Sequence, residues 1–183
     1  MSWVMVDVET GGRQYPTTLS TSGGLTGTRI PANGITEFAA IVCREPLIAF
    51  YGAIDRIERK ASSENKFEEI TVVQQSQPVY TMQQFALWLS KHCNGNPKFI
   101  SDNNGFDWQF INVYFHECMR SNPFGHSSQN LGSLYKGLVR STKKNFKHLR
   151  KTPHTHHPLD DALGNVEALF HMVNTMGLEM ELI

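Results

Sequence analysis

Cysteine is scarce in this sequence. The 183 residues include three cysteines, Cys43, Cys93 and Cys118, which are odd in number, lie far apart and form no C-x-x-C pair. This pattern argues against a disulfide scaffold and against a zinc ribbon. A reducing cytoplasm is therefore the simplest compartment for the protein.

An excess of charge of one sign and a long apolar run are also missing. Lysine and arginine together number 17, as do aspartate and glutamate, which gives a formal net charge of +0. No strong overall field therefore attracts nucleic acid or an anionic membrane.

The start of the chain, MSWVMVDVET, has neither the basic start nor the apolar core of a signal peptide. No apolar run approaches the roughly 18 residues that span a bilayer, so we expect a cytoplasmic protein that does not bind membranes.

Apolar residues are present in the amount that a folded core requires. Hydrophobic residues make up 40% of the chain and charged residues 19%, as in soluble globular proteins. A length of 183 residues is typical of one domain and is sufficient to bury a core without disulfides. We therefore expect residues 1–183 to form a single domain.

Hydrophobic patterning predicts a mixed order of strands and helices. Short apolar and β-branched runs predict strands at 3–8, 35–42, 47–54 and 98–102. Apolar spacings of three and four predict helices at 81–92, 106–119, 129–139 and 158–176, the first of them capped by Thr81. The break at 44–46 predicts an antiparallel hairpin, and the later alternation of strand and helix predicts an α/β fold with helices packed on a mixed sheet. Residues 11–34, rich in glycine, serine and threonine, are expected to form a long functional or mobile loop, and 56–79 carry no clear pattern.

Acidic residues recur at the ends of these predicted elements. Asp7 and Glu9 lie two apart near the end of the first strand, and a period of two places both carboxylates on one face. Other acids lie in the first turns of two helices or just before one of them: Asp107, Asp160, Asp161 and a second candidate, Asp102. Each acid alone is explained by solvent exposure or by a helix-dipole effect of under about 1 kcal/mol. Gathered at one end of a sheet, they would repel one another unless a cation lay among them.

Hard oxygen ligands of this kind suit Mg²⁺ or Mn²⁺, and two such ions can stabilise the attacking and leaving oxygens of phosphodiester cleavage. A histidine cluster adjoins one group of acids, because His154, His156 and His157 precede Asp160. The cluster could bind a metal, cap the following helix or perform acid–base chemistry. A zinc site of His154, His156 and Asp161 is one alternative, although it lacks the usual zinc motifs.

Three motifs in order resemble those of the DEDDh 3′–5′ exonucleases, a family of the RNase H-like superfamily that includes proofreading exonucleases, oligoribonuclease and RNase T. They are DVETGG with Asp7 and Glu9, NNGFD with Asp107, and HHPLDDA with His156 and Asp161. ITEFAAIV at 35–42 resembles the second strand of the family, and NPFGHS at 122–127 resembles stand-alone nucleases of phage and bacterial defence systems. The resemblance spans almost the entire chain, apart from the long 11–34 segment, which shorter family members lack.

The resemblance implies an RNase H-like mixed sheet, with an antiparallel hairpin at its start and parallel strands beyond, flanked by α-helices. It also implies a metal-dependent 3′–5′ exonuclease that releases nucleoside 5′-monophosphates. Two Mg²⁺ or Mn²⁺ ions would be held by four acids, Asp7, Glu9, Asp107 and Asp161. His156 would be the general base that activates water, and Thr10 and Gly11 would lie near the terminal sugar. His154 and His157 lie off the motif and are expected to be exposed loop residues.

A basic stretch precedes the histidine motif. KGLVRSTKKNFKHLRK at 136–151 contains Lys136, Arg140, Lys143, Lys144, Lys147, Arg150 and Lys151. We expect this stretch, and Lys143, Lys144 and Lys147 in particular, to attract the phosphates of a strand whose 3′ end reaches the site. A solvated surface is the alternative. Phe106 and Trp108 could stack on bases, although core packing also explains them.

Two other functions stay open on the sequence alone. A degenerate nuclease fold would grip nucleic acid without cutting it, and a metal-dependent phosphodiesterase would act on a small nucleotide or dinucleotide. A single-stranded 3′ end is the expected substrate, but the sequence does not distinguish DNA from RNA. It also leaves open whether the chain forms a homo-oligomer.

Overall fold

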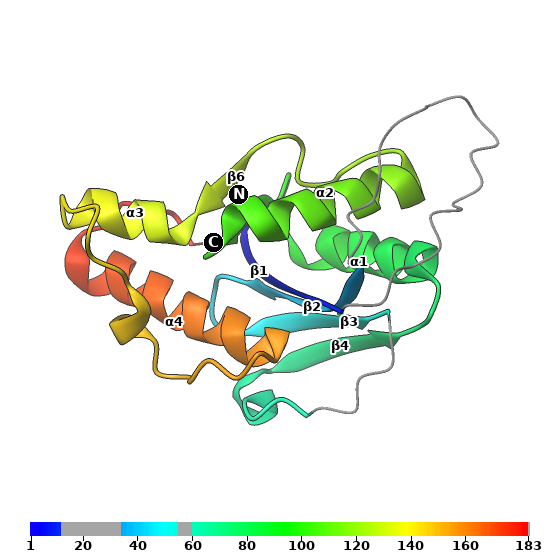
Figure 1. Cartoon of the computed structure of the whole chain (residues 1–183), viewed down its shortest axis with the longest axis horizontal. Coiled ribbons are helices and arrows are strands. Elements are labelled where there is room, and N and C mark those ends of the chain that lie inside the picture. Colours follow the sequence, from blue (N-terminus) through cyan, green and yellow to red (C-terminus); the bar gives the residue numbers. More distant parts are fainter. Residues whose placement is uncertain (12–33, 55–59, 183) are drawn as a thin grey trace.

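A mixed β-sheet forms the centre of the protein (Figure 1). The computed structural model describes residues 1–11, 34–54 and 60–182, so the expected loop at 11–34 lies outside the described residues except for its two ends. The described strands are β1 Trp3–Thr10, β2 Ile35–Val42, β3 Ile48–Ala53, β4 Glu69–Gln74, β5 Lys98–Ser101 and β6 Ser128–Asn130. They lie in the order β4-β3-β2-β1-β5-β6. The pairs β1–β2 and β2–β3 are antiparallel, and β3–β4, β1–β5 and β5–β6 are parallel.

Helices cover both faces of this sheet (Figure 1). The α-helices are α1 Pro78–His92, α2 Asn104–Met119, α3 Leu131–Leu138 and α4 Pro158–Met176, and two 3₁₀ turns lie at Glu64–Lys66 and Lys147–Leu149. α1 and α2 pack on one face, and α4 packs on the other with α3 beside it. Among the described residues, no helix combines the length and the apolar character that a membrane span requires.

The side chains of β1 alternate between two hydrophobic cores. Its three valines pack with residues of α1 and α2, whereas Met5 packs with residues of α4. Because successive strand residues point to opposite faces, Asp7 and Glu9 lie on the same side of the sheet as Met5. The apolar pattern of β1 therefore directs two carboxylates toward the face that α4 covers.

The predicted α/β fold is confirmed, and every predicted strand and helix is present. Two strands were missed. β4 lies at the edge of the sheet, where its EITVVQ sequence is mostly half-buried or exposed, and β6 has three residues, too few for a pattern. The predicted start of α1 was wrong, because the helix begins at Pro78 and Thr81 is buried inside it. Proline fits the first helical position, where no backbone N–H is needed, and so the helix starts one turn earlier than the threonine suggested.

Candidate active site

Three elements bring four of the predicted acids together. Asp7 and Glu9 lie near the end of β1. Their carboxylate oxygens lie within 4.8 Å of each other and of an oxygen of Asp161, which lies in the first turn of α4. Asp107 lies in the first turn of α2, and its Oδ1 accepts a hydrogen bond of 3.2 Å from the backbone N–H of Val8, between the two β1 acids. The end of β1 and the first turns of α2 and α4 therefore meet in one region of the structure.

Burial makes the close approach of these carboxylates electrostatically unfavourable. Burial raises the pKa of Asp7 well above its usual value, and the neighbouring carboxylates of Asp107 and Asp161 raise it further. Burial also raises the pKa of Asp107 to about 7, against the opposing effect of the nearby Ser101 hydroxyl and the Val8 N–H, and the charges of Asp102 and Glu9 add to the rise. Asp107 Oδ2 is buried and has no hydrogen-bond partner among the described residues. An all-oxygen donor set of this kind fits a hard divalent cation, which would lower these pKa values and use the unpaired oxygen.

The two adjacent acids at the start of α4 have different surroundings. Asp160 accepts hydrogen bonds from the backbone N–H groups and hydroxyls of Ser62 and Ser63 and from the hydroxyl of Thr155. Burial alone would raise the pKa of Asp160, but these hydrogen bonds lower it below its usual value. Asp160 therefore anchors the segment around Ser62, and Asp161 is the acid of this pair that faces β1.

The segment before α4 wraps around the carboxylate of Asp161. The backbone N–H groups of Thr155 and His156 donate to its two oxygens at 2.9 and 3.1 Å. The imidazole of His154 lies against the same carboxylate, with Nδ1 2.8 Å from Oδ2. His156 adopts a left-handed backbone conformation, with φ of 59°. Its side chain is 71% exposed, and its Nδ1 lies 3.9 Å from Glu9 Oε1.

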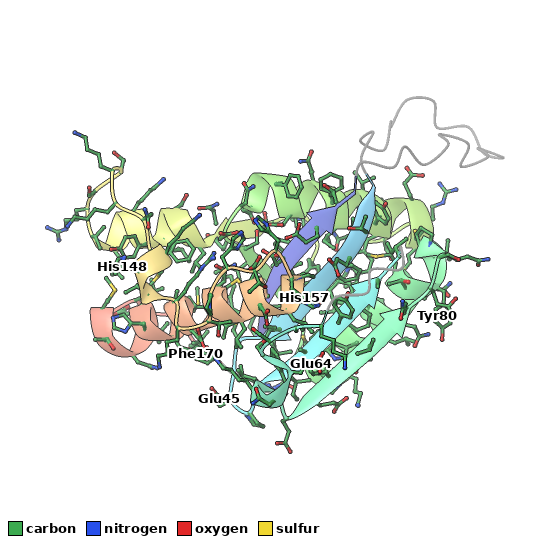
Figure 2. All side chains as sticks on the ribbon, turned by 60° about the horizontal axis from the view of Figure 1, so that its bottom comes forward. Glu45, Glu64, Tyr80, His148, His157 and Phe170 are labelled. Carbon is green, nitrogen blue, oxygen red and sulfur yellow. The ribbon has the colours of Figure 1, made fainter. Side chains whose placement is uncertain are left out.

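His157 is not the exposed loop residue that we expected. It is buried at the start of α4 (Figure 2), where its Nδ1 accepts a hydrogen bond of 3.2 Å from the backbone N–H of Leu159. Its ring stacks on Tyr51, with 5.3 Å between centroids. The interpretation of the cluster as a helix cap therefore holds for this histidine, and proline at the next position completes the start of the helix.

Tyr51 and Glu37 extend this contact across the sheet, and the sequence analysis did not single them out. The Tyr51 hydroxyl donates to Glu37 Oε2 at 2.5 Å, and Glu37 lies directly opposite Glu9 in the β1–β2 ladder. A signal for Glu37 was present, because it is an acid inside the otherwise apolar strand ITEFAAIV. A fully buried acid is rare unless it is paired.

The predicted substrate-binding residues at the end of β1 lie beside the acids. A Cβ added at Gly11 would lie 2.5 Å from Thr36 Cγ2, so any other residue here requires the Thr36 side chain to move. Thr10 is half-buried at the last position of β1. Phe106 is half-buried next to Asp107 and contacts Phe110 edge to face, with 4.9 Å between centroids. Trp108 packs edge to face on the buried Phe99, which supports a core role for it.

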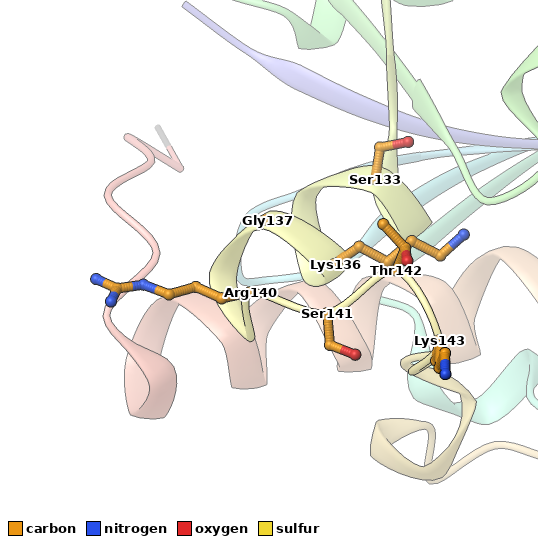
Figure 3. A pocket seen from close by; sticks show the side chains of 7 residues that line it. All are labelled: Ser133, Lys136, Gly137, Arg140, Ser141, Thr142 and Lys143. Atoms are coloured by element: carbon orange, nitrogen blue, oxygen red, sulfur yellow. The ribbon is translucent and has the colours of Figure 1, made fainter.

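The basic stretch at 136–151 divides into an exposed part and a buried part. Lys143, Lys144 and Lys147 are exposed. A hollow of about 640 Å³ at the end of α3 is lined by Ser133, Lys136, Gly137, Arg140, Ser141, Thr142 and Lys143 (Figure 3). These groups are accessible to phosphates.

Arg150, which we counted with this stretch, is instead buried. Its side chain is 7% exposed, and its Nη2 lies 2.8 Å from Asp102 Oδ2 and 2.5 Å from Asn165 Oδ1. Arg150 therefore ties the end of β5 to α4 and neutralises an acid beside the site. No sequence signal separates this arginine from its exposed neighbours.

The comparison with known sequences gives one partial match. No family model matches the chain. The 3′-5′ DNA exonuclease Cap18 of Escherichia coli is 38% identical over 63 residues, which are 33% of this chain and 34% of that protein. The match thus spans about a third of the length of this relative.

The comparison with solved structures covers nearly the whole chain. The nuclease domain of 3′hExo, a DEDDh family member bound to rAMP, has a TM-score of 0.59 at 13% identity, over 98% of this chain and 94% of that one. The zinc-bound complex of E. coli ExoI with ssDNA has a TM-score of 0.51 at 13% identity, over 96% of this chain and 41% of that one. The predicted fold is thereby confirmed, because this chain shares it with the nuclease domain of a DEDDh family member, and at 13% identity the likeness is one of fold.

Proposed function

We propose that residues 1–183 form a single domain that acts as a metal-dependent 3′–5′ exonuclease and releases nucleoside 5′-monophosphates. One observation carries this proposal: oxygens of Asp7, Glu9 and Asp161 lie within 4.8 Å of one another, and two of these acids, Asp7 and Asp161, are buried. Carboxylates are held this close, at the cost of mutual repulsion, where a cation binds. The partial sequence match to a 3′-5′ DNA exonuclease supports the reaction class and favours DNA as substrate.

The metal would be held by the four acids. Asp7, Glu9, Asp107 and Asp161 offer oxygen atoms alone, which suits two Mg²⁺ or Mn²⁺ ions. When bound, such ions stabilise charge on the attacking and leaving oxygens of the phosphodiester. The unpaired, buried Oδ2 of Asp107 supports this assignment, because a buried carboxylate oxygen without a partner is costly.

His156 would take the proton from the attacking water. Its imidazole is exposed beside Glu9 rather than packed in the core, so water and substrate can reach it. The left-handed backbone at His156 and the hydrogen bond from its N–H to Asp161 fix its place relative to the acids. Imidazole is a common proton acceptor in catalysis near neutral pH, and the exposed ring can return the proton to solvent.

The substrate strand would reach the acids past the end of β1 and the basic surface. Thr10, Gly11 and Phe106 adjoin the acids and would surround the terminal nucleotide. The ammonium groups of Lys143, Lys144 and Lys147 would bind phosphates further along a single strand, by charge and without reading its sequence.

Degradation of oligonucleotides labelled at one end tests this function. With Mg²⁺, a 5′-labelled single strand should shorten stepwise from its 3′ end, and EDTA should stop the reaction. Matched DNA and RNA strands, single- and double-stranded, identify the substrate class. Cleavage of dinucleotides but not of longer strands would replace the exonuclease with a small-nucleotide phosphodiesterase. Binding without cleavage in any divalent metal would indicate a degenerate nuclease fold.

A further inference from the structure

His154 lies outside the three sequence motifs, yet its imidazole contacts Asp161, with Nδ1 2.8 Å from Oδ2. We propose that His154, His156 and Asp161 form a second metal site, which takes a borderline ion such as Zn²⁺ and competes with the site made of acids. One ligand atom from each of the three side chains lies within 4.8 Å of the others. This grouping is distinct from the grouping of Asp7, Glu9 and Asp161, but both include Asp161.

The local backbone holds the two histidines on the same carboxylate. The N–H groups of Thr155 and His156 both donate to Asp161. This wrapping brings the rings of His154 and His156 to 4.3 Å between centroids, at an interplanar angle of 67°. The His154 and His156 side chains are 49% and 71% exposed. Their ring nitrogens can therefore close around an ion by side-chain rotation, and solvent can occupy its remaining position.

The donor set distinguishes this site from the acid cluster. Two imidazoles and one carboxylate are ligands that Zn²⁺ commonly takes with a fourth position left open. Mg²⁺ prefers oxygen ligands and keeps its waters, so it has little affinity for imidazole. The order of divalent stabilities also places Zn²⁺ above Mn²⁺ at nitrogen-containing sites. Zn²⁺ would therefore bind at the histidines, and the hard ion would bind at the acids.

Zn²⁺ bound at the histidine site would inhibit the nuclease, an expectation that rests on the proposed function. A Zn²⁺ ion there would take Asp161 from the acid cluster. It would also occupy a ring nitrogen of His156, the proposed proton acceptor. Zn²⁺ should therefore inhibit in competition with Mg²⁺.

Direct binding tests the site without any assay of activity. Zn²⁺ is titrated into metal-free protein in competition with a chromophoric chelator, for wild type, His154→Gln and the control His126→Gln, which changes an exposed histidine elsewhere. We expect His154→Gln to weaken Zn²⁺ binding by about tenfold or more, the scale seen when metal sites lose a supporting group. His126→Gln should bind as wild type does, and Mg²⁺ affinity should change little in either variant.

Two results of this titration would overturn the proposal. The first is equal Zn²⁺ affinity in His154→Gln and wild type. The second is a larger loss of Zn²⁺ affinity in Asp7→Asn than in His154→Gln, which would put the ion among the acids. If His154→Gln fails to fold, as judged by thermal melting, His156→Gln serves in the same titration, because its side chain is mostly exposed.

Inhibition is measured separately. At fixed Mg²⁺, the Zn²⁺ concentration that halves nuclease activity should rise about tenfold in His154→Gln, in step with its affinity. If Zn²⁺ supported cleavage by the wild-type protein in place of Mg²⁺, this result would contradict the claim that Zn²⁺ inhibits in competition with Mg²⁺. A protein that binds Zn²⁺ through His154 but cleaves no nucleic acid would refute the proposed function and leave the site standing.

Discussion

Asp160 and Asp161 are adjacent in the chain, but their carboxylates have different partners. Asp160 is enclosed by the N–H groups and hydroxyls of Ser62 and Ser63, at 2.6 to 3.1 Å. Asp161 lies within 4.8 Å of the acids of β1. Consecutive helical residues point in directions about 100° apart, so one helical turn can supply both an anchor for a loop and a ligand for a metal.

This difference predicts different effects of two neighbouring substitutions. Asp160→Ala should lower the free energy of unfolding by about 2–4 kcal/mol, because it leaves the two buried donors of Ser63 and the part-buried donors of Ser62 and Thr155 without a charged acceptor. Asp161→Asn should lower stability less than Asp160→Ala, because removal of one like charge offsets the loss of one acceptor oxygen for the N–H groups of Thr155 and His156. It should reduce the rate by about 10² or more, as expected when transition-state charge loses its support. Denaturant unfolding and single-turnover cleavage of both variants measure the two effects. Equal loss of activity at equal stability would show that the roles are not divided in this way.

The raised pKa of Asp107 predicts how stability depends on pH. Its value of about 7 in the folded state, caused chiefly by burial, compares with 3.8 for a free carboxyl. The protonated group favours folding, so its contribution is fully present below about pH 4 and is lost as pH rises through about 7. In metal-free protein this loss should be at most about 4 kcal/mol.

Urea unfolding at about pH 5 and about pH 8 measures the larger part of this loss. Asp107→Asn should reduce the difference between the two conditions, and the remaining difference includes the contribution of Asp7, whose pKa is also raised. Mg²⁺ should restore stability to wild type at the higher pH. Comparison with the variant cancels the contributions of other titrating groups. The same pH dependence in both proteins would mean that Asp107 ionises normally.

His156→Ala should impair proton transfer and leave Mg²⁺ binding intact. Removal of a positioned base typically costs about 10²–10⁴ in rate, and kcat should fall far more than substrate affinity. The remaining activity should rise with pH, as hydroxide replaces the base. His126→Ala is the control, since His157 caps α4 and stacks on Tyr51. Loss of the Mg²⁺ ion from His156→Ala would identify this histidine as a ligand instead.

Neutralising Lys143, Lys144 and Lys147 together should weaken the binding of long strands. All three are exposed, so each can release one counterion on contact with a phosphate. The slope of log affinity against log salt should therefore become shallower by about 2 for a single strand, about 0.7 for each lysine. Dinucleotide cleavage should change little, because so short a substrate does not reach these residues. An unchanged salt slope would mean that this surface is merely solvated.

Elements with a strong apolar pattern were predictable from the sequence, and weakly patterned edges were not. β2 is buried along its whole length and α4 has regular apolar spacing, so both ranges follow from residue type. β4 is stabilised by its parallel pairing with β3, a contact between segments that the sequence does not relate. Strand identity at a sheet edge therefore depends on the neighbouring strand more than on the local pattern.

The acids of the candidate site were named from their motifs, whereas the residues that support them were not. Asp7, Glu9 and Asp161 stand at fixed spacings within recognisable stretches. Arg150 reaches Asp102 and Asn165 only because the chain folds back on α4. Its role depends on tertiary contacts, and a basic run gives no hint of which member is buried.

Substitution of Asp7 tests the central claim most directly, because burial and four neighbouring acids raise the pKa of Asp7. Its oxygens also lie with those of Glu9 and Asp161. The measurement is cleavage of a 5′-labelled single strand by Asp7→Asn across a Mg²⁺ titration, with folding checked by thermal melting. We predict no detectable shortening at any Mg²⁺ concentration, in a protein as stable as wild type or slightly more so, since one like charge is removed. Full activity of Asp7→Asn in saturating Mg²⁺ would contradict a metal-dependent exonuclease built on this acid cluster.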